Sequence, residues 1–329
     1  MSNMRVLFSG FRNHLHSKEG GYDRIANMTG SDRLFADEML LWKKWDSAVS
    51  KRLTLLLLDI ITRIKRRKYD FTHLFYGEFS MFYFIPYVRS ARHKLVITIH
   101  MDLEKRRFKK LFLKSLKAFD GVIVLSRAQQ KSLKEKYGIN SVFIPHGFNH
   151  PQYQDVLPVS LKGEAFDKNK INVIVIGQNY RDFKLLYDVI STIKRKDILF
   201  HLVGIPLDEK VKYERFKDVT RIYKYLDSNE YYSLIEHSDY NFLPLTYATA
   251  NNTLLEAQFL NVCSILPDID GVSDYASPEN IFYSDKDECF RIFSNLKKRD
   301  RTVGVIKEFA EKFKWENIYK LLREYYNTL

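Results

Sequence analysis

Several residue types and sequence patterns are rare or missing in this chain of 329 residues. Its two cysteines, Cys263 and Cys289, form neither a disulfide framework nor metal-ligand spacing, so a reducing compartment is expected. The longest apolar runs, such as residues 53–61, are interrupted by Asp59 and are too short to span a bilayer. The first ten residues have a strand pattern and lack that of a signal peptide. Solenoid repeats, low-complexity tracts and zinc motifs are also missing, which leaves an ordinary globular protein.

The composition is that of a folded protein with an uneven charge. Hydrophobic residues make up 45% of the chain and aromatic residues 15%, and the length allows two domains with their own cores. Residues 1–150 hold 28 Lys+Arg and 13 Asp+Glu, a net charge of +15, whereas residues 151–329 hold 25 and 27, a net charge of −2. This asymmetry predicts an anionic partner for the first half, which is a nucleic acid, an anionic membrane surface or a lipid diphosphate.

Short apolar runs that predict buried strands alternate with helical patterns along the chain. Residues 151–170 lack periodicity and are predicted to link two halves. The expected strands are residues 4–9, 71–76, 94–99, 121–126, 141–147, 171–177, 199–204, 223–226, 240–245 and 262–266. The expected helices include residues 53–68, with a basic end, 80–92, with many aromatic residues, 129–137, and 228–237, with Ser228 as its cap.

A basic amphipathic helix is predicted over residues 103–119. Its apolar side chains Leu111, Phe112, Leu116 and Phe119 are expected to face the core, while lysines and arginines face outward. An outward basic face of this kind either lies in solvent or meets a membrane surface.

The stretch 240–276 predicts a strand, a small polar loop, a helix and a second strand. Asn252 or Thr253 is expected to cap the helix, Glu256 to lie in its first turn, and Asn261 to end it. A small-residue loop before a helix N-terminus suits an anion, and a carboxylate one turn inside can bind sugar hydroxyls. On this pattern alone, an ordinary strand–helix–strand unit with a surface glutamate remains the alternative.

The order of residues in this stretch resembles retaining glycosyltransferase family 4, the group 1 family. Residues 254–257, Leu-Leu-Glu-Ala, match the second half of the family's Glu-x7-Glu motif, and residues 271–274 match its later Gly-Gly-x-x-Glu turn, with Asp in place of Glu. Two positions depart from the family: Ala248 stands where the first Glu is expected, and residues 261–263 stand where Gly-x-Pro is expected. The runs FDGVIVLS and YGINSVFIPHGFN match the end of the family's first domain, and residues 313–316 resemble its closing Phe-Ser-Trp segment.

The resemblance implies an α/β architecture, the GT-B fold, in which two Rossmann-like doubly wound domains face each other across a cleft. The first domain is expected over residues 1–150, with a C-terminal helix of about residues 312–329 packing back on it, and is expected to hold the acceptor. The second is expected over residues 165–311 and to hold the nucleotide sugar.

The resemblance also implies the residues of the site. His100, after the strand 94–99, is expected beside the transferred sugar, and Asn251 and Asn252 are expected to replace the missing carboxylate at Ala248; these three are the catalytic candidates. The acceptor-side candidates are Glu19, Glu78 and Asp102. The donor-binding candidates are Gly20, Gly21, Arg181, Lys184, Tyr225, Leu226, Thr253, Leu254 and Glu256. Structural roles remain the alternative for each: a flexible turn for the glycines, a solvated helix start for Arg181 and Lys184, and a buried side chain for His100.

The expected function is transfer of a hexose, with retention, from a UDP- or GDP-linked sugar to a lipid-linked or saccharide acceptor in bacterial O-antigen, capsule or lipopolysaccharide assembly. No metal and no cofactor are expected, because Arg, Lys and a helix N-terminus can stabilise the leaving diphosphate. The basic first half predicts a peripheral position on the inner, cytoplasmic face of the membrane.

Three other functions remain open at this stage. A sugar-nucleotide epimerase shares the two-domain architecture and acts without an acceptor. A non-catalytic nucleotide-sugar-binding protein is compatible with the loss of a motif carboxylate at Ala248. Nucleic-acid binding is compatible with the charge, but no recognition motif of that class is present, so no nucleic-acid partner is expected.

Overall fold

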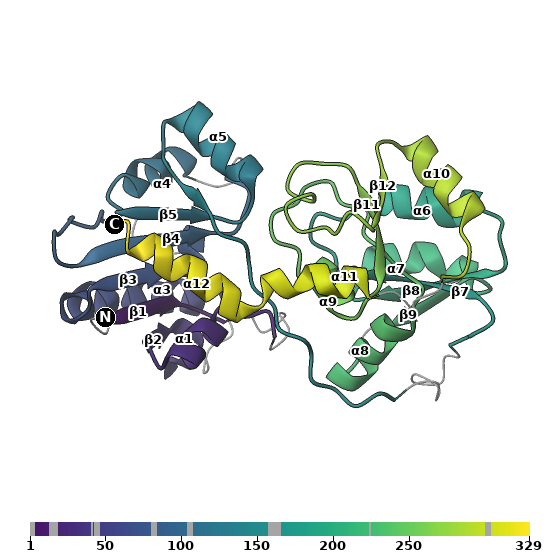
Figure 1. Cartoon of the computed structure of the whole chain (residues 1–329), viewed down its shortest axis with the longest axis horizontal. Coiled ribbons are helices and arrows are strands. Elements are labelled where there is room, and N and C mark those ends of the chain that lie inside the picture. The colour runs from purple at the N-terminus through teal and green to yellow at the C-terminus, as the bar shows by residue number, and fades with distance from the viewer. Residues whose placement is uncertain are drawn as a thin grey trace. The chain divides into compact units, whose positions relative to one another are not determined.

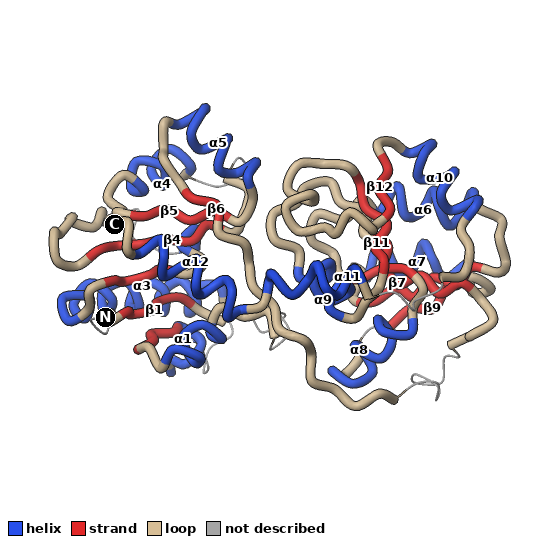
Figure 2. The backbone as a smooth tube through the Cα atoms, viewed as in Figure 1, coloured by secondary structure: helices blue, strands red, loops and turns tan. Residues whose placement is uncertain are grey.

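The computed structural model describes residues 4–12, 19–40, 42, 47–79, 84–103, 108–156, 166–223, 225–299 and 304–329. The chain divides into two compact units, which are described separately below (Figures 1 and 2). Unit 1 comprises Met1–Phe148 with Phe313–Leu329, and unit 2 comprises Asn149–Lys312.

Unit 1 is built on a sheet of six parallel strands. In spatial order these strands are β2 (Asp32–Phe35), β1 (Val6–Gly10), β3 (Phe71–Leu74), β4 (Lys94–Ile99), β5 (Gly121–Val124) and β6 (Val142–Phe143). The helices of this unit are α1 (Asp23–Thr29), α3 (Ala48–Lys65), α4 (Lys109–Leu116), α5 (Arg127–Tyr137) and α12 (Trp315–Tyr326). The central strands are buried on both faces and carry continuous apolar runs, as parallel strands covered by helices do.

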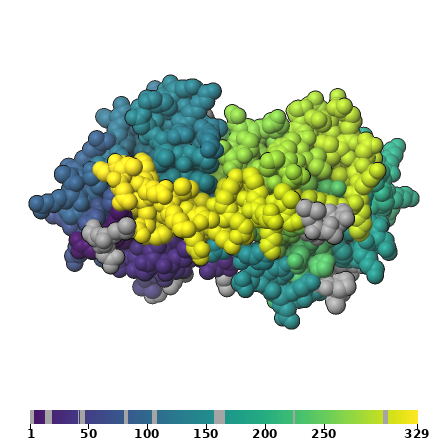
Figure 3. All heavy atoms as spheres, in the orientation of Figure 1, coloured from purple at the N-terminus to yellow at the C-terminus, as the bar shows by residue number. Residues whose placement is uncertain are grey.

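The C-terminal helix α12 packs on the sheet of unit 1, where Figure 3 shows the C-terminal segment lying over earlier parts of the chain. The His73 ring is hydrogen-bonded through Nδ1 to the Tyr326 hydroxyl at 2.7 Å and through Nε2 to Thr98 Oγ1 at 2.7 Å. Tyr326 also stacks on Phe71, with ring centroids 4.7 Å apart. Burial lowers the pKa of His73 to about 3, so this histidine is neutral near pH 7.

Unit 2 contains a second parallel sheet of six strands. In spatial order these are β12 (Ile281–Tyr283), β11 (Cys263–Pro267), β10 (Tyr240–Phe242), β7 (Ile171–Ile176), β8 (Ile198–Val203) and β9 (Thr220–Tyr223). Its helices are α6 (Phe183–Thr192), α7 (Leu207–Tyr213), α8 (Ser228–His237), α9 (Asn252–Phe259), α10 (Lys286–Asn295) and α11 (Val305–Ala310). The predicted α/β class with two doubly wound sheets is confirmed.

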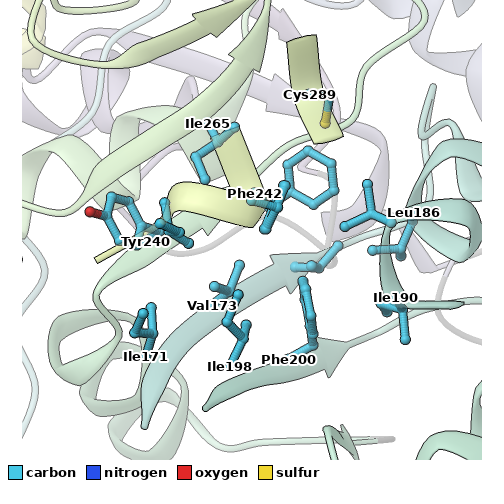
Figure 4. Packing of buried hydrophobic residues seen from close by; sticks show 14 of the residues in the cluster. Ile171, Val173, Leu186, Ile190, Ile198, Phe200, Tyr240, Phe242, Ile265 and Cys289 are labelled. Carbon is cyan, nitrogen blue, oxygen red and sulfur yellow. The ribbon is translucent and has the colours of Figure 1, made fainter. Parts of the chain in front are cut away.

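The core of unit 2 forms where β7, β8 and β10 pack against α6 and α10 (Figure 4). Its centre is apolar and closely packed, with Val173, Phe200 and Phe242 buried. A second buried histidine bridges strands on the opposite face of this sheet: His201 of β8 is hydrogen-bonded to the Tyr223 hydroxyl at 3.0 Å and to Asn172 Oδ1 at 2.9 Å. Burial lowers the pKa of His201 to about 3 as well.

Two predicted helices of unit 1 differ from the structure: one is not found in its described residues, and the other is shorter than predicted. Of the helix predicted over 80–92, residues 84–92 are not helical and residues 80–83 lie outside the described residues. Phe84, Ile85 and Val88 are exposed, and the Ile85 and Val88 carbonyls accept hydrogen bonds from arginine side chains. The basic helix predicted over 103–119 is the shorter α4, which begins after the left-handed residue Phe108, and residues 104–107 lie outside the described residues. Leu111 is exposed and Leu113 is buried, so the buried stripe of α4 contains Phe112, Leu113 and Leu116 and is centred one side away from Leu111.

Smaller corrections concern caps and strand ends. Asp227 caps α8 through a capping box with Glu230, so Ser228 is the first helical residue and not the cap. The strand predicted over 223–226 is β9, which ends at Tyr223. Asn261 is left-handed, as a residue that ends a helix often is, with φ of 58°.

Residues 151–156, the described start of the predicted linker, run along α8 and are hydrogen-bonded to it. The backbone N–H of Gln154 donates to Asn229 Oδ1 at 3.0 Å, and that of Val156 donates to Ser233 Oγ at 3.0 Å. Polar side chains of α8 therefore satisfy an extended backbone that has no strand partner, which sequence periodicity does not reveal.

Candidate functional site

Each sheet has one point where the strand order reverses. In unit 2 the chain runs from β7 to β8 and β9 on one side, and then adds β10, β11 and β12 on the other side. In doubly wound sheets, ligands bind beyond the carboxyl ends of the strands at such a reversal. The loops after β7 and β10 meet there: Thr246 N donates to Tyr180 O at 2.9 Å, and Asp182 N donates to Pro244 O at 2.7 Å.

Arg181 connects these loops to the first turn of α9. Its guanidinium donates to Ile176 O at 3.0 Å, to Asn179 O at 3.0 Å and to Thr253 Oγ1 at 3.1 Å. Burial lowers the pKa of Arg181 to about 10, so the side chain remains positively charged near pH 7. A desolvated cation beside a helix N-terminus is suited to a diphosphate.

Glu256 is buried in the second turn of α9, with an exposed fraction of 4%. Its Oε2 accepts a hydrogen bond of 2.6 Å from the Tyr231 hydroxyl, which comes from α8. Burial, and then the neighbouring carboxylate, raise the pKa of Tyr231 well above its usual value, so the phenol stays a donor. Glu256 is therefore not a surface glutamate, and the surface alternative is wrong.

The remaining donor-binding candidates differ in their exposure. Thr253 and Leu254 are buried at the start of α9. Lys184 is exposed near the start of α6, whose cap is Asp182. Tyr225 is exposed and Leu226 is buried, and both follow β9 on the edge of the sheet that carries the carboxyl ends of the strands.

In unit 1 the strand order reverses between β1 and β3, and the loop that contains Glu19, Gly20 and Gly21 follows β1. The Glu19 carboxylate forms an ion pair of 2.6 Å with Arg24. The indole Nε1–H of Trp315 donates to Glu19 O at 2.8 Å, and a Cβ on Gly147 would overlap this indole ring. The C-terminal segment therefore holds the glycine loop in place.

His100 lies directly after β4, among aromatic rings at the same edge of the sheet. Its ring stacks on Tyr76 with centroids 4.0 Å apart and lies perpendicular to Tyr22 at 5.0 Å. Its backbone N–H donates to Glu78 Oε1 at 3.1 Å, and the Glu78 side chain is buried beneath it. Glu78, predicted to lie on the acceptor side, thus contacts the backbone of His100, and Asp102 follows two residues later with partial exposure.

A pocket opens at the carboxyl ends of β1 and β3, at the reversal point of unit 1. Among its lining side chains, Asp59 accepts hydrogen bonds from the Tyr87 hydroxyl at 2.7 Å and from Arg63 Nε at 2.9 Å. The pocket is lined by Ser9, Gly10, Phe11, Leu55, Leu58, Asp59, Thr62, Leu74, Phe75, Tyr76 and Tyr87.

Residues 38–151, which form most of unit 1, match the family model of Glycosyltransferase Family 4. The family resemblance is confirmed. No curated protein sequence matches this chain.

Three solved glycosyltransferase structures share the fold of the whole chain. HepE of Anabaena, solved with UDP and glucose, has a TM-score of 0.70 and 15% identity, covering 99% of this chain and 100% of HepE. The lipopolysaccharide outer core galactosyltransferase WaaB has a TM-score of 0.68 and 13% identity, covering 99% and 100%. A glycosyltransferase from Rickettsia africae has a TM-score of 0.66 and 16% identity, covering 99% and 98%. The chain thus has the GT-B fold of these glycosyltransferases.

The start of α9, which resembles a family 4 motif, contains the two asparagines predicted to replace the missing carboxylate at Ala248. Asn251 is the N-cap of α9, because its side chain accepts from Leu254 N at 3.2 Å, which corrects the predicted cap at Asn252 or Thr253. Asn252 is the first helical residue and is half-buried, and Ala248 is buried in the preceding loop. Asn251 therefore has a capping task, and a catalytic task for Asn252 stays a prediction.

Alanine substitutions separate these tasks. The Asn251→Ala change is expected to lower the free energy of unfolding by about 1 kcal/mol, since it removes the cap. The Asn252→Ala change is expected to lower sugar transfer more than nucleotide affinity, while stability stays the same. Chemical denaturation and steady-state kinetics of both variants are the measurements, and each variant is the control for the other. Wild-type transfer rates in both would remove the asparagines from the catalytic site.

Three residues that contact the site candidates Glu256, Glu19 and His100 were not predicted from the sequence. Tyr231 lies 25 positions before Glu256, and Trp315 lies 296 positions after Glu19, so no local pattern joins either pair. Tyr76 has a left-handed backbone with φ of 51°, which an aromatic residue rarely adopts and which the sequence does not indicate.

In the described part of the chain, one group of side chains has the composition of a metal site: Asp155, Glu236 and His237, with donor atoms within 4.8 Å of one another. His237 Nε2 lies 2.9 Å from Asp155 Oδ2, and Tyr153 donates to Glu236. These contacts join the linker to the end of α8. Because α8 leads directly into β10, they lie at the edge of the sheet that carries the amino ends of the strands. We therefore assign them a structural role.

Proposed function

We propose that this protein transfers a hexose from a UDP- or GDP-linked sugar to a lipid-linked or saccharide acceptor. The observation that carries the proposal is the pairing of Arg181 with Thr253 at the start of α9, one turn from the buried carboxylate of Glu256. This arrangement lies at the strand reversal of unit 2, where a doubly wound sheet binds its ligand.

Each group of this site has a defined task in the proposed reaction. Arg181 and the N–H groups at the start of α9 bind the diphosphate and stabilise its negative charge as the sugar leaves. The exposed ammonium of Lys184 adds a second cation from the start of α6. Glu256, oriented by Tyr231, accepts hydrogen bonds from the ribose hydroxyls. These groups supply the needed charge without a metal, and we propose that the product retains the configuration of the donor.

The similar proteins support the choice of donor and setting. HepE was solved with UDP and glucose and also with UDP-glucose, which favours a UDP-linked donor. WaaB is a lipopolysaccharide outer core galactosyltransferase, which favours a role in bacterial surface-polysaccharide assembly. The net charge of +15 on residues 1–150 supports an anionic, lipid-linked acceptor at the cytoplasmic face of the membrane. We assign the acceptor to unit 1, with His100 beside the transferred sugar.

A thermal-shift series with UDP, GDP, ADP and their sugars tests the donor. A nucleotide that binds only the folded protein stabilises it by about 2.7 kcal/mol at a hundredfold excess over its Kd. One nucleotide is expected to raise the melting temperature clearly above the other two. The absence of any shift with all three bases would contradict the proposed donor site.

Product analysis with the selected donor then separates the alternatives. Transfer requires an acceptor and yields a free nucleoside diphosphate together with a glycosylated product. An epimerase converts the donor in the absence of an acceptor. A non-catalytic binding protein shows the thermal shift and no product with either lipid-linked or saccharide acceptors.

A further inference from the structure

The helix α3 carries an apolar stripe on its outer surface. Five aliphatic side chains of α3 are between 37% and 69% exposed. They are separated by four, four, three and four positions, so they lie along one side of the helix. They are Val49, Leu53, Leu57, Ile60 and Ile64.

The inner side of the same helix is rich in hydroxyl groups. Thr54 Oγ1 donates to Ser50 O at 2.8 Å, and Thr62 Oγ1 donates to Leu58 O at 2.7 Å and lies 2.7 Å from Ser9 Oγ of β1. The buried hydroxyls are thereby satisfied, and small side chains face the sheet. A surface helix of a soluble domain normally has its apolar stripe inside and its polar side outside, so α3 is reversed.

A neighbouring loop extends the apolar stripe. Phe84, Ile85 and Val88 are 49% to 81% exposed. The loop is fixed to α3, because Arg63 donates to the carbonyls of Ile85 and Pro86, and Arg66 Nη2 donates to Val88 O at 3.0 Å. The five residues of the stripe together with Phe84, Ile85 and Val88 are called the α3 apolar face below.

The surroundings of the α3 apolar face are strongly basic. Residues 47–68, 84–94 and 108–117 hold seven, three and four Lys or Arg residues. The same segments contain one acidic residue, Asp59, which is buried and bound to Tyr87 and Arg63. The exposed cations are Arg52, Lys65, Arg67, Lys68, Arg89, Arg92, Lys110, Lys114 and Lys117.

We propose that the α3 apolar face enters the headgroup region of an anionic lipid bilayer, with the surrounding cations at the lipid phosphates. Aliphatic and aromatic side chains bordered by Lys and Arg are the composition that binds such an interface. A second copy of this chain fits less well, because pairing two such faces would bring their basic borders together. Large contiguous apolar surfaces are rare on soluble monomers and usually mark a site of contact with a membrane or another protein.

The α3 apolar face also suggests how a lipid-linked acceptor reaches unit 1. This part of the inference rests on the proposed function. Leu55, Leu58 and Thr62 of α3 line the pocket at the ends of β1 and β3. One helix therefore contacts the bilayer on its outer side and the pocket on its inner side. A lipid-linked acceptor would reach the pocket from the bilayer surface without leaving it.

Vesicle sedimentation with the full-length protein tests the contact. The wild type is expected to bind vesicles of phosphatidylcholine with about 30% phosphatidylglycerol, and to bind pure phosphatidylcholine more weakly. The triple change Leu53→Gln, Ile60→Gln and Ile64→Gln is expected to lower partitioning to the anionic vesicles at least about tenfold. The matched control is Leu207→Gln with Val211→Gln in α7 of unit 2, where both side chains are also exposed, and it is expected to bind as wild type does.

Two further measurements make each outcome decisive. Thermal unfolding checks that the triple variant is folded. If it is not, the change Arg52→Gln, Lys65→Gln and Lys68→Gln replaces it, because it alters only exposed cations. This second variant is also expected to bind anionic vesicles more weakly. Analytical ultracentrifugation without lipid tests the second copy as occupant. Unchanged vesicle binding by the folded variants, or a wild-type dimer that the triple variant dissociates, overturns the proposal.

The nucleotide thermal shift of the same variants separates this inference from the proposed function. Vesicle binding that depends on the α3 apolar face, in a protein that binds no nucleotide, would refute the function and support the surface. Nucleotide binding with no preference for anionic vesicles would refute the surface and leave the function standing.

Discussion

Replacement of Glu256 by alanine is expected to lower the affinity for the donor nucleotide at least about tenfold, since a hydrogen bond to a charged group contributes about 1.5–3 kcal/mol. The carboxylate is buried and oriented by Tyr231, so it meets the ribose hydroxyls already desolvated. Isothermal titration with the nucleotide found by thermal shift is the measurement. Glu256→Gln keeps the shape and is expected to lose less affinity than the alanine variant.

The Tyr231→Phe variant is the control for this prediction. It removes the hydroxyl that donates to Glu256 and keeps both the ring and the carboxylate. Its affinity is expected to lie between those of wild type and Glu256→Ala, because the carboxylate remains but is no longer held. An alanine variant that binds nucleotide like the wild type would show that Glu256 has only a structural role.

Acidification from about pH 7.5 to about pH 5 is expected to destabilise each unit by about 2 kcal/mol through its buried histidine. The pKa values of His73 and His201 are both lowered to about 3 by burial, whereas an unfolded histidine titrates near 6.5. Below about pH 6.5 the unfolded chain therefore binds protons that the folded chain does not. The stabilising effect is complete above that pH and is lost as the pH falls towards 3.

The distribution of tryptophan allows the two units to be followed separately. All three tryptophans, Trp42, Trp45 and Trp315, belong to unit 1, so their fluorescence in a denaturant series reports on that unit, while far-ultraviolet circular dichroism reports on both. The His73→Gln change is expected to flatten the pH dependence seen by fluorescence, and His201→Gln to leave it as in wild type. Equal pH slopes in wild type and His73→Gln would rule out the histidine as the cause.

Much of the fold was predictable because buried parallel strands leave a strong local signal. The run Leu95–Ile99 is apolar except for Thr98 and lies between Lys94 and His100, and the predicted strand Lys94–Ile99 has the bounds of β4. The short edge strand β2, Asp32–Phe35, has a mostly exposed and polar pattern, so no apolar run marked it. A helix was predicted over residues 80–92, but in the described residues 84–92 backbone carbonyls accept hydrogen bonds from Arg63 of α3 and from Arg66, which directly follows α3.

The resemblance of residues 254–257 to a family 4 motif was already visible in the sequence, as were the candidate Arg181, the missing carboxylate at Ala248 and the basic charge of the first half. These features depend only on which residues are present and in what order, so the sequence alone is enough to recognise them.

The contacts that complete the site were decided by the tertiary structure alone. Tyr231 meets Glu256, and Trp315 meets Glu19, only because helices distant in sequence pack beside one another. The same is true of the side that α3 turns outward. Residues 55–58 are four consecutive leucines, so apolar side chains surround the helix and periodicity does not select an inner side. The choice was made by the hydroxyls of Thr54 and Thr62, which bond to carbonyls of their own helix and so can face the sheet, leaving the aliphatic stripe outside.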